Sequence, residues 1–141
     1  MNKKIILLII MLLLGITATA SARDIPRTDP ERKAILNAAR SEPTIRFVVK
    51  DLYRSGNFAW LCALKSDNGE LRRTDESIEV YAYILMRNKG VWVAKDMWYG
   101  FLGNEGTNDC SKAVDEIPDL AGPPTSEKDL KTIWQFAHSY R

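Results

Sequence analysis

The chain has 141 residues, of which 20 are Lys or Arg, 18 are Asp or Glu and one is His, which gives a formal net charge of +2. Lys3 and Lys4 are the charged residues that precede residue 23, so a chain beginning at residue 23 carries equal numbers of both signs. This balance argues against nucleic-acid binding and against an electrostatic membrane tether, because both need a clustered basic surface.

The N-terminus has the layout of a secretory signal peptide, which we predict over residues 1–22. Lysines precede an apolar run of 10 residues, Ile5–Leu14, and small residues follow as far as Ala22. The run is short for a membrane-spanning helix, which needs about 20 residues. Since the first Cys is Cys62, a lipoprotein anchor is not available either. We therefore expect cleavage near Ala22, a periplasmic or secreted protein, and no membrane anchor after cleavage.

The remaining length predicts a single α+β domain, residues 29–141, after a flexible leader at residues 23–28. The first predicted helix covers residues 29–40. Asp29 is a suitable N-cap, and Pro30 suits the first helical position because its missing N–H would have no helical partner there. Apolar residues then recur at helical spacing, which predicts one face packed against a core.

Strands are predicted to follow, because the spacing of apolar residues changes from helical to alternating. We expect the strands at residues 44–50, 58–64, 78–86 and 91–99. The strand at 58–64 is apolar on both faces, which is typical of a central strand covered on both sides. The last two strands flank Arg87–Gly90, a hairpin turn in which Gly supplies a positive φ. The polar residues 65–77 are expected to form an exposed loop.

In an exported chain, the two cysteines Cys62 and Cys110 predict one disulfide. By closing the loop between these residues, the disulfide would stabilise the fold by roughly 4 kcal/mol in the chain-entropy model. The alternative is two unpaired thiols. The bridge would pin the Gly- and Pro-rich residues 100–124 to the sheet, with one or two helical turns after Cys110. A terminal helix is predicted at residues 126–138, where Ser126 can cap the N-terminus and apolar side chains share one face.

These elements together predict an α+β fold: an N-terminal helix packed on a four-stranded antiparallel meander, a disulfide-pinned loop and a short C-terminal helix, with the helices on one face of the sheet. The arrangement resembles cystatin-like and NTF2-like α+β rolls. In particular, Arg87-Asn-Lys-Gly-Val-Trp-Val looks like the basic-Gly-x-Trp-x-Val hairpin of such domains.

A second resemblance covers roughly the first half of the chain that follows residue 22. The segment 29–40, followed by Phe47-Val-Val and then Gly56-Asn-Phe-Ala, looks like a family of small exported proteins from Gram-negative bacteria. The resemblance implies an uncharacterised periplasmic protein and transfers no catalytic residues. This chain has a shorter link after the first helix and a longer Cys-containing tail than that family.

No catalytic residue, metal site or cofactor is predicted. His138 is the single histidine, and a general base needs an orienting partner and a nucleophile within reach, so we expect a solvated side chain. A zinc site draws on several His or Cys ligands, which one histidine does not supply. Gly-x-Ser-x-Gly, His-Glu-x-x-His and phosphate-loop motifs are absent from the sequence. The balance of these observations favours a protein that is not an enzyme.

Four aromatic residues lie between residues 92 and 101. Trp92 is predicted to lie in the core, against the first helix or the neighbouring strand. Trp98, Tyr99 and Phe101 lie where the last strand meets the Gly-rich loop. Aromatic rings at such a rim are candidate anchors for a ligand or partner. The alternative is that the Cys110 loop and the terminal helix cover them.

Two functions remain open from the sequence. The first is a non-enzymatic accessory, inhibitor or immunity-type module that binds another periplasmic protein or a small ligand at Trp98, Tyr99 and Phe101. The alternative is an envelope hydrolase or isomerase with an acidic pocket around Asp96 in an NTF2-like roll. A pocket with polar groups converging on Asp96 favours the enzyme, and an exposed apolar patch favours a partner.

Overall fold

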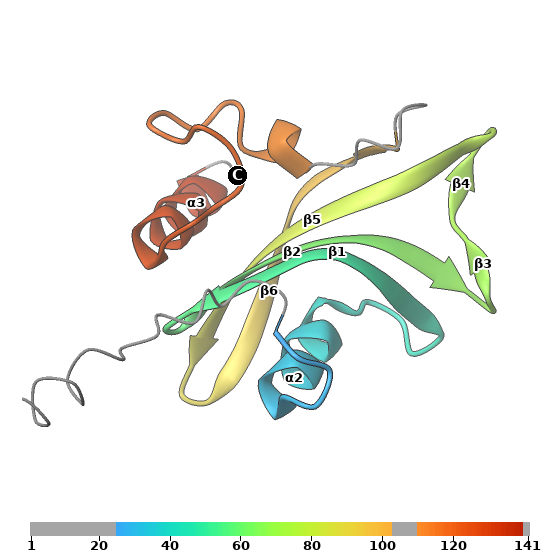
Figure 1. The fold of residues 1–141 in the computed structure, drawn as a ribbon, viewed down its shortest axis with the longest axis horizontal. Coiled ribbons are helices and arrows are strands. Elements are labelled where there is room, and N and C mark those ends of the chain that lie inside the picture. The colour runs from blue at the N-terminus through green and yellow to red at the C-terminus, as the bar shows by residue number, and fades with distance from the viewer. Residues whose placement is uncertain (1–24, 103–109, 140–141) are drawn as a thin grey trace, which may run out of the picture.

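The computed structural model describes residues 25–102 and 110–139, which form a curved antiparallel sheet with a helix against each face (Figure 1). The predicted signal peptide, residues 1–22, lies outside the described residues. In chain order the elements are α2 (Pro30–Ala39), β1 (Ile45–Ser55), β2 (Phe58–Asp67), β3 (Glu70–Leu71), β4 (Arg73–Thr74), β5 (Ser77–Asn88), β6 (Val91–Phe101), the 3₁₀ helix η1 (Cys110–Ala113) and α3 (Glu127–Ser139).

The sheet has six strands within the described residues, so the predicted four-stranded meander is wrong. The long strands pair in the order β1-β2-β5-β6, while β3 pairs with β2 and β4 with β5. Residues 65–77, expected as a loop, extend β2 to Asp67, begin β5 at Ser77 and form β3 and β4 between them. The turn explains this difference. Asn68 and Gly69 have φ values of 51° and 85°, which fold the chain back onto β2.

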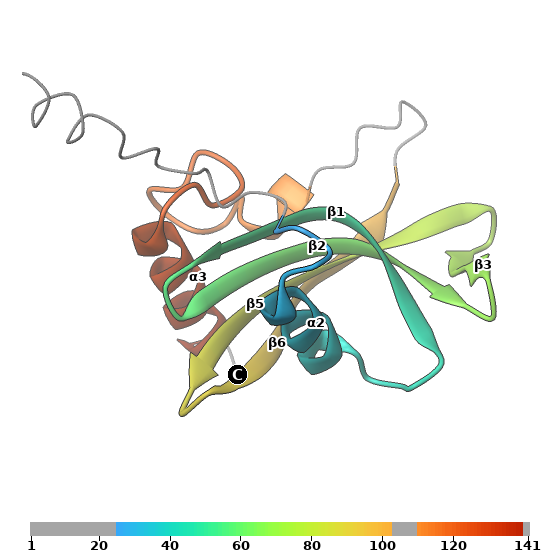
Figure 2. The ribbon, with the colours of Figure 1, turned by 60° about the horizontal axis from the view of Figure 1, so that its bottom comes forward.

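The two helices cover opposite faces of the sheet, whereas we expected both on one face (Figure 2). Successive residues of a strand point to opposite sides. Trp60 and Leu64 of β2 belong to a buried cluster with Ile133 of α3. Leu61 between them belongs to a second cluster with Ile35 of α2. A strand that is apolar on both faces needs cover on both sides, and one helix on each face supplies it.

The predicted disulfide is confirmed on the α3 face of the sheet. Cys62 of β2 and Cys110 of η1 are bonded, with their Cα atoms 6.0 Å apart. Val114 and Ile117, which follow η1, are buried in the same cluster as α3. The bridge therefore holds a segment with little regular structure against the sheet, as the loop-rich composition required.

Both predicted helices are confirmed, together with their N-terminal caps. The side chain of Asp29 accepts a hydrogen bond from the Glu31 backbone N–H at 2.9 Å. The Ser126 hydroxyl accepts one from the Asp129 backbone N–H at 3.1 Å. Such caps satisfy N–H groups that have no partner inside the helix. The helix limits therefore follow from local side-chain chemistry.

Trp92 lies in the core, as predicted, and connects the β5–β6 hairpin to α2. Its side chain is 6% exposed, and its indole N–H donates to the Glu31 carboxylate at 2.5 Å. Arg87 forms an ion pair with the same carboxylate at 3.0 Å, and its guanidinium lies over the Trp92 ring. The hairpin turn is tight because Lys89 and Gly90 both have positive φ, 51° and 77°. These contacts fix which side of α2 faces away from the sheet.

Candidate functional site

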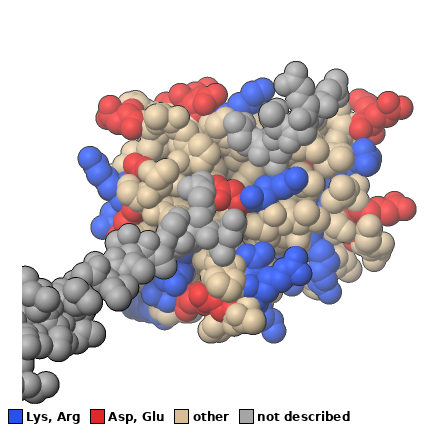
Figure 3. Space-filling model, in the orientation of Figure 1, with Lys and Arg blue, Asp and Glu red and all other residues tan. Residues whose placement is uncertain are grey.

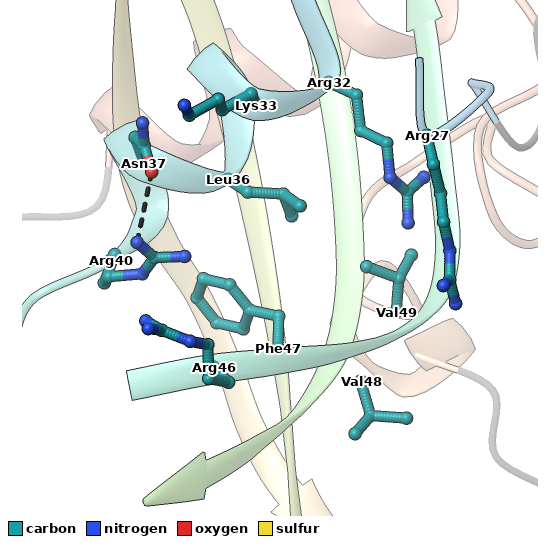
Figure 4. Close-up of a pocket in the computed structure, with 10 residues that line it drawn as sticks. All are labelled: Arg27, Arg32, Lys33, Leu36, Asn37, Arg40, Arg46, Phe47, Val48 and Val49. Atoms are coloured by element: carbon teal, nitrogen blue, oxygen red, sulfur yellow. Dashed lines mark hydrogen bonds between the residues drawn. The ribbon is translucent and has the colours of Figure 1, made fainter. Parts of the chain in front are cut away.

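A groove of about 650 Å³ lies between α2 and the first half of β1 (Figure 4). We call it the basic groove, and its lining residues are Arg27, Arg32, Lys33, Leu36, Asn37, Arg40, Arg46, Phe47, Val48 and Val49. Five of these side chains are cationic and none is acidic. Figure 3 shows Lys and Arg gathered on the part of the surface where Figure 1 places α2.

The amphipathic pattern of α2 builds one wall of the basic groove. Ile35 and Ala39 are buried against the sheet. Arg32, Leu36 and Arg40 follow one another at four-residue spacing, and residues four apart lie on the same side of a helix. All three line the groove. Along this wall, a cationic side chain is followed by an apolar one and then by a second cationic one.

The basic groove has two arginines at each end and an apolar floor between them (Figure 4). Arg40 and Arg46 lie at one end, which we call the loop end because the α2–β1 link joins them. Arg27 and Arg32 lie at the other, which we call the leader end. The floor consists of Leu36, Phe47 and Val49. This arrangement suits a ligand that is anionic at both ends and apolar in the middle.

The positive charge of the basic groove is not neutralised by a described acid. Three guanidinium groups donate to neutral oxygens: Arg32 to a backbone carbonyl at 2.9 Å, Arg40 to the Asn37 side chain at 3.1 Å and Arg46 to a backbone carbonyl at 3.3 Å. Within residues 25–102 and 110–139, the arginines and the lysine of the groove form no ion pair with a carboxylate. The Nε of Arg40 is buried without a hydrogen-bond partner in that same part of the chain. An unpaired buried donor costs about 1–3 kcal/mol, which an acceptor on a ligand would recover.

Two acids close to the basic groove in sequence are engaged outside it. Glu31 holds Arg87 and Trp92 on the sheet side of α2. Glu42, in the link between α2 and β1, lies 3.6 Å from Arg72. Because these two carboxylates are directed elsewhere, neither of them offsets the positive charge of the basic groove.

A second polar cluster surrounds Lys65 of β2. Lys65 is 8% exposed, and its amine lies 3.9 Å from the centre of the Tyr81 ring and 5.5 Å from that of Tyr83. Burial lowers the pKa of Lys65, although the charge of Asp96 opposes the shift. The Tyr81 hydroxyl donates to Glu79, and burial together with this hydrogen bond raises the pKa of Tyr81 to about 12. In this cluster the tyrosines therefore keep their protons to a higher pH than usual, and the Lys65 amine loses its proton at a lower pH than usual.

A pocket of about 250 Å³ lies beside this cluster, and it includes Asp96, the residue of the expected acidic pocket. Asp96 itself is exposed and pairs with Tyr83 at a β-bulge, where Met97 is the extra residue of β6. The other lining residues are Tyr81, Ala82 and Trp98. One carboxylate among these residues does not provide the pair of acids that a glycosidase needs.

Two of the three predicted binding residues, Trp98 and Phe101, lie on opposite faces of the sheet. Trp98 pairs with Ala82 of β5 and Phe101 pairs with Glu79. Paired residues share a face, and these β5 partners are an odd number of residues apart, so Trp98 and Phe101 lie on opposite faces. Trp98 is partly buried against the α3-side cluster, and Phe101 is 46% exposed. The side chain of Tyr99 lies outside the described part of the structure.

Other functional features of the described residues are few. His138 is exposed, as expected, and its Nδ1 lies 2.8 Å from the carbonyl oxygen of Trp134. No group of three or more His, Cys, Asp or Glu side chains in residues 25–102 and 110–139 is arranged to hold a metal ion. No helix in these residues is both long and apolar enough to cross a bilayer.

The basic groove is not apparent from the sequence, because its cations come from three separate segments. Arg27 lies in the predicted leader, Arg46 lies in an alternating strand, and Arg40 suits a helix C-terminus by itself. The one local signal is the row Arg32, Leu36, Arg40, which flanks the buried residues Ile35 and Ala39 of α2. That row alone does not indicate what lies across from it.

No known protein family, curated protein or solved structure matches this chain. The resemblance to cystatin-like and NTF2-like rolls and to small exported proteins therefore stays an expectation. Any function for the chain has to be argued from the geometry of its own site.

Proposed function

We propose that this protein is an exported, non-enzymatic binding module that holds an anionic ligand or an acidic partner in the basic groove. The observation that carries the proposal is that, among the described residues, five cationic side chains and no acidic one surround an apolar floor. Four of the five are arginines, whose planar guanidinium groups bind carboxylates and phosphates through paired hydrogen bonds. An anion also relieves the repulsion among these neighbouring charges.

Export is the second part of the proposal. The layout of residues 1–22 is that of a signal peptide. The Cys62–Cys110 bridge supports export as well, because disulfides persist in oxidising compartments such as the periplasm. A periplasmic or secreted location would bring the basic groove into contact with envelope and extracellular proteins.

Binding of polyglutamate, measured by isothermal titration calorimetry, tests the proposal. We expect binding at low salt that weakens as salt is added, since screening acts over about 10 Å at 0.1 M salt. The double variant Arg40→Gln, Arg46→Gln removes the loop end and should reduce affinity by about tenfold or more. Arg73→Gln is the matched control, because Arg73 is exposed in β4 and is absent from the groove lining. Equal binding by both variants, or no binding of polyglutamate and polyphosphate, would reject the proposal.

The alternative, a hydrolase or isomerase, is favoured by one observation at the smaller pocket. Asp96 lines this pocket with Tyr81 and Tyr83, and its charge acts on the nearby Lys65 amine. A lysine of lowered pKa is a possible base when its proton is released near the working pH. A screen of ester and glycoside substrates tests this function with Asp96→Asn and Lys65→Met. Turnover that persists in both variants would exclude this pocket as the catalytic site.

A further inference from the structure

We propose that the occupant of the basic groove is an extended acidic segment of another protein, which adds to the free edge of β1. Its carboxylates would lie four residues apart, one at each end of the groove, with an apolar residue midway between them. This inference rests on the proposed function and specifies the class of partner that the groove accepts.

The edge of β1 is the first support for an added strand. β1 pairs with β2 on one side, and within the described residues no strand pairs with it on the other. Val48 lines the basic groove together with Phe47 and Val49, so side chains from both faces of β1 border it. The groove therefore runs along the strand edge, where unpaired backbone groups can bind an extended peptide.

The length of the basic groove is close to the distance between residues i and i+4 of an extended peptide. Arg46 at the loop end is three residues, or about 10 Å along β1, from Val49, the floor residue nearest the leader end. Arg32 and the C-cap residue Arg40 are eight residues apart, or about 12 Å along the axis of α2. In an extended peptide, residues i and i+4 share a face and are about 13 Å apart. Residue i+2 lies between them on the same face, above Leu36 of the floor.

The chemistry of the two ends and of the floor favours a peptide over a small anion. A free phosphate or carboxylate fills one end only and leaves Leu36, Phe47 and Val49 uncovered. A segment with the pattern acidic-x-apolar-x-acidic satisfies the arginines at both ends and covers the floor. Its backbone supplies partners for the edge of β1 at the same time.

A second copy of this chain fits the edge less well than an acidic segment does. Pairing β1 with β1 of another copy would bring the exposed Arg46 and Lys50 of both chains close together. Like charges on an edge strand are a device by which sheets avoid edge-to-edge association. An acidic strand turns this repulsion into attraction, and so charge complementarity selects the partner.

The test compares labelled peptides by fluorescence anisotropy with the purified protein. The first has a Glu-Thr-Val-Thr-Glu core, the second has the same composition with the two Glu adjacent, and the third has Lys in place of both Glu. We expect the first to bind about tenfold more tightly than the second, the effect of one charge-assisted carboxylate contact. The third should not bind. Backbone amides of residues 46–49 should exchange with solvent more slowly in the first complex.

Variants separate the strand inference from the proposed function. Arg40→Gln with Arg46→Gln should abolish the preference for the spaced peptide, whereas Arg73→Gln should keep it, with circular dichroism checking that both fold. Equal affinity for the spaced and adjacent peptides, unchanged amide exchange along β1, or equally tight binding of inorganic phosphate would each overturn the strand inference. In those cases polyglutamate binding would still support anion binding by the basic groove. Loss of all anion binding would overturn both.

Discussion

The two faces of the sheet differ in how they are covered. On the α3 face, α3, η1 and the disulfide enclose an apolar cluster in which Trp60 and Ile84 have no exposed surface. On the α2 face, the helix packs mainly on β6 and β5 and leaves the basic groove beside β1 and the Lys65 cluster on β2. The disulfide and the larger buried cluster therefore lie on the α3 face, and the basic groove and the Lys65 cluster lie on the α2 face.

Removal of the disulfide should have the largest effect, because it opens the α3 face. The variant Cys62→Ser, Cys110→Ser is expected to lose roughly 4 kcal/mol of unfolding free energy, measured by urea titration. Wild-type protein unfolded with a reductant is the control and should show a similar loss. Free thiols in the unreduced, denatured protein would contradict the bridge.

A smaller effect is expected at Gly100, where the α3 face meets the end of β6. A Cβ at this position would overlap the Trp98 ring. Gly100→Ala should therefore destabilise the protein by about 1–3 kcal/mol, as overpacking does in other cores. On the background of Trp98→Ala the same substitution should cost much less, because the ring is gone. Equal costs on both backgrounds, measured by urea unfolding, would mean that Trp98 does not pack over Gly100.

On the α2 face, the charge of Glu31 should contribute less to the free energy of unfolding than the disulfide or Gly100 does. Glu31→Gln removes the ion pair between Glu31 and Arg87. Because both side chains are about one-third exposed, the substitution should lower the free energy of unfolding by about 1 kcal/mol or less. Glu127→Gln is the matched control, since it breaks a more exposed pair with Lys131 on α3, worth about 0.5 kcal/mol or less. Thermal unfolding compares the two. A larger loss in the control would refute the role of Glu31 in fixing α2.

The smallest expected effect is a change of stability with alkaline pH from the Lys65 cluster. The pKa of Tyr81 is about 12 in the folded chain, whereas the ordinary pKa of a tyrosine is 10.0, so the folded chain keeps a proton that the unfolded chain releases. This contribution is present below pH 10 and is lost as pH rises towards 12. Lys65 acts with the opposite sign below pH 10.5, because its pKa is lowered.

Tyr81→Phe should flatten the alkaline loss of stability, and Lys65→Met should remove the opposing contribution. Urea midpoints measured across alkaline pH test both expectations, and tyrosinate absorbance reports the ionisation of Tyr81 directly. A profile in Tyr81→Phe that is identical to the wild-type profile would show that this hydroxyl has no raised pKa in the folded chain.

Elements with strong local signals were predictable from the sequence. Asp29 and Ser126 mark the start of the two helices because their side chains satisfy N–H groups within a few residues. The Lys89-Gly90 turn defines the β5–β6 hairpin through its positive φ values. The pairing of Cys62 and Cys110 followed from their number and from the predicted export.

Errors arose where distant segments decide the result. β3 and β4 have two residues each and exist because their neighbours β2 and β5 offer edges to pair with, which polar composition does not reveal. The two apolar faces of β2 indicated cover on both sides, but nothing in α2 or α3 specifies which face each helix takes. The rim of Trp98, Tyr99 and Phe101 was inferred from nearness in sequence. Regular strand alternation puts Trp98 and Phe101 on opposite faces, and the binding role of the three residues stays a prediction.

The sequence by itself determined the helices, the long strands, the hairpin and the cysteine pair, because each depends on hydrogen bonds or periodicity within a short segment. Tertiary structure alone decided that α2 and α3 lie on opposite faces and that Arg27, Arg40 and Arg46 line one groove beside β1. The physical reason is that burial of apolar area selects the packing of whole elements. The charges carried on their outer sides come together only as a result of that packing.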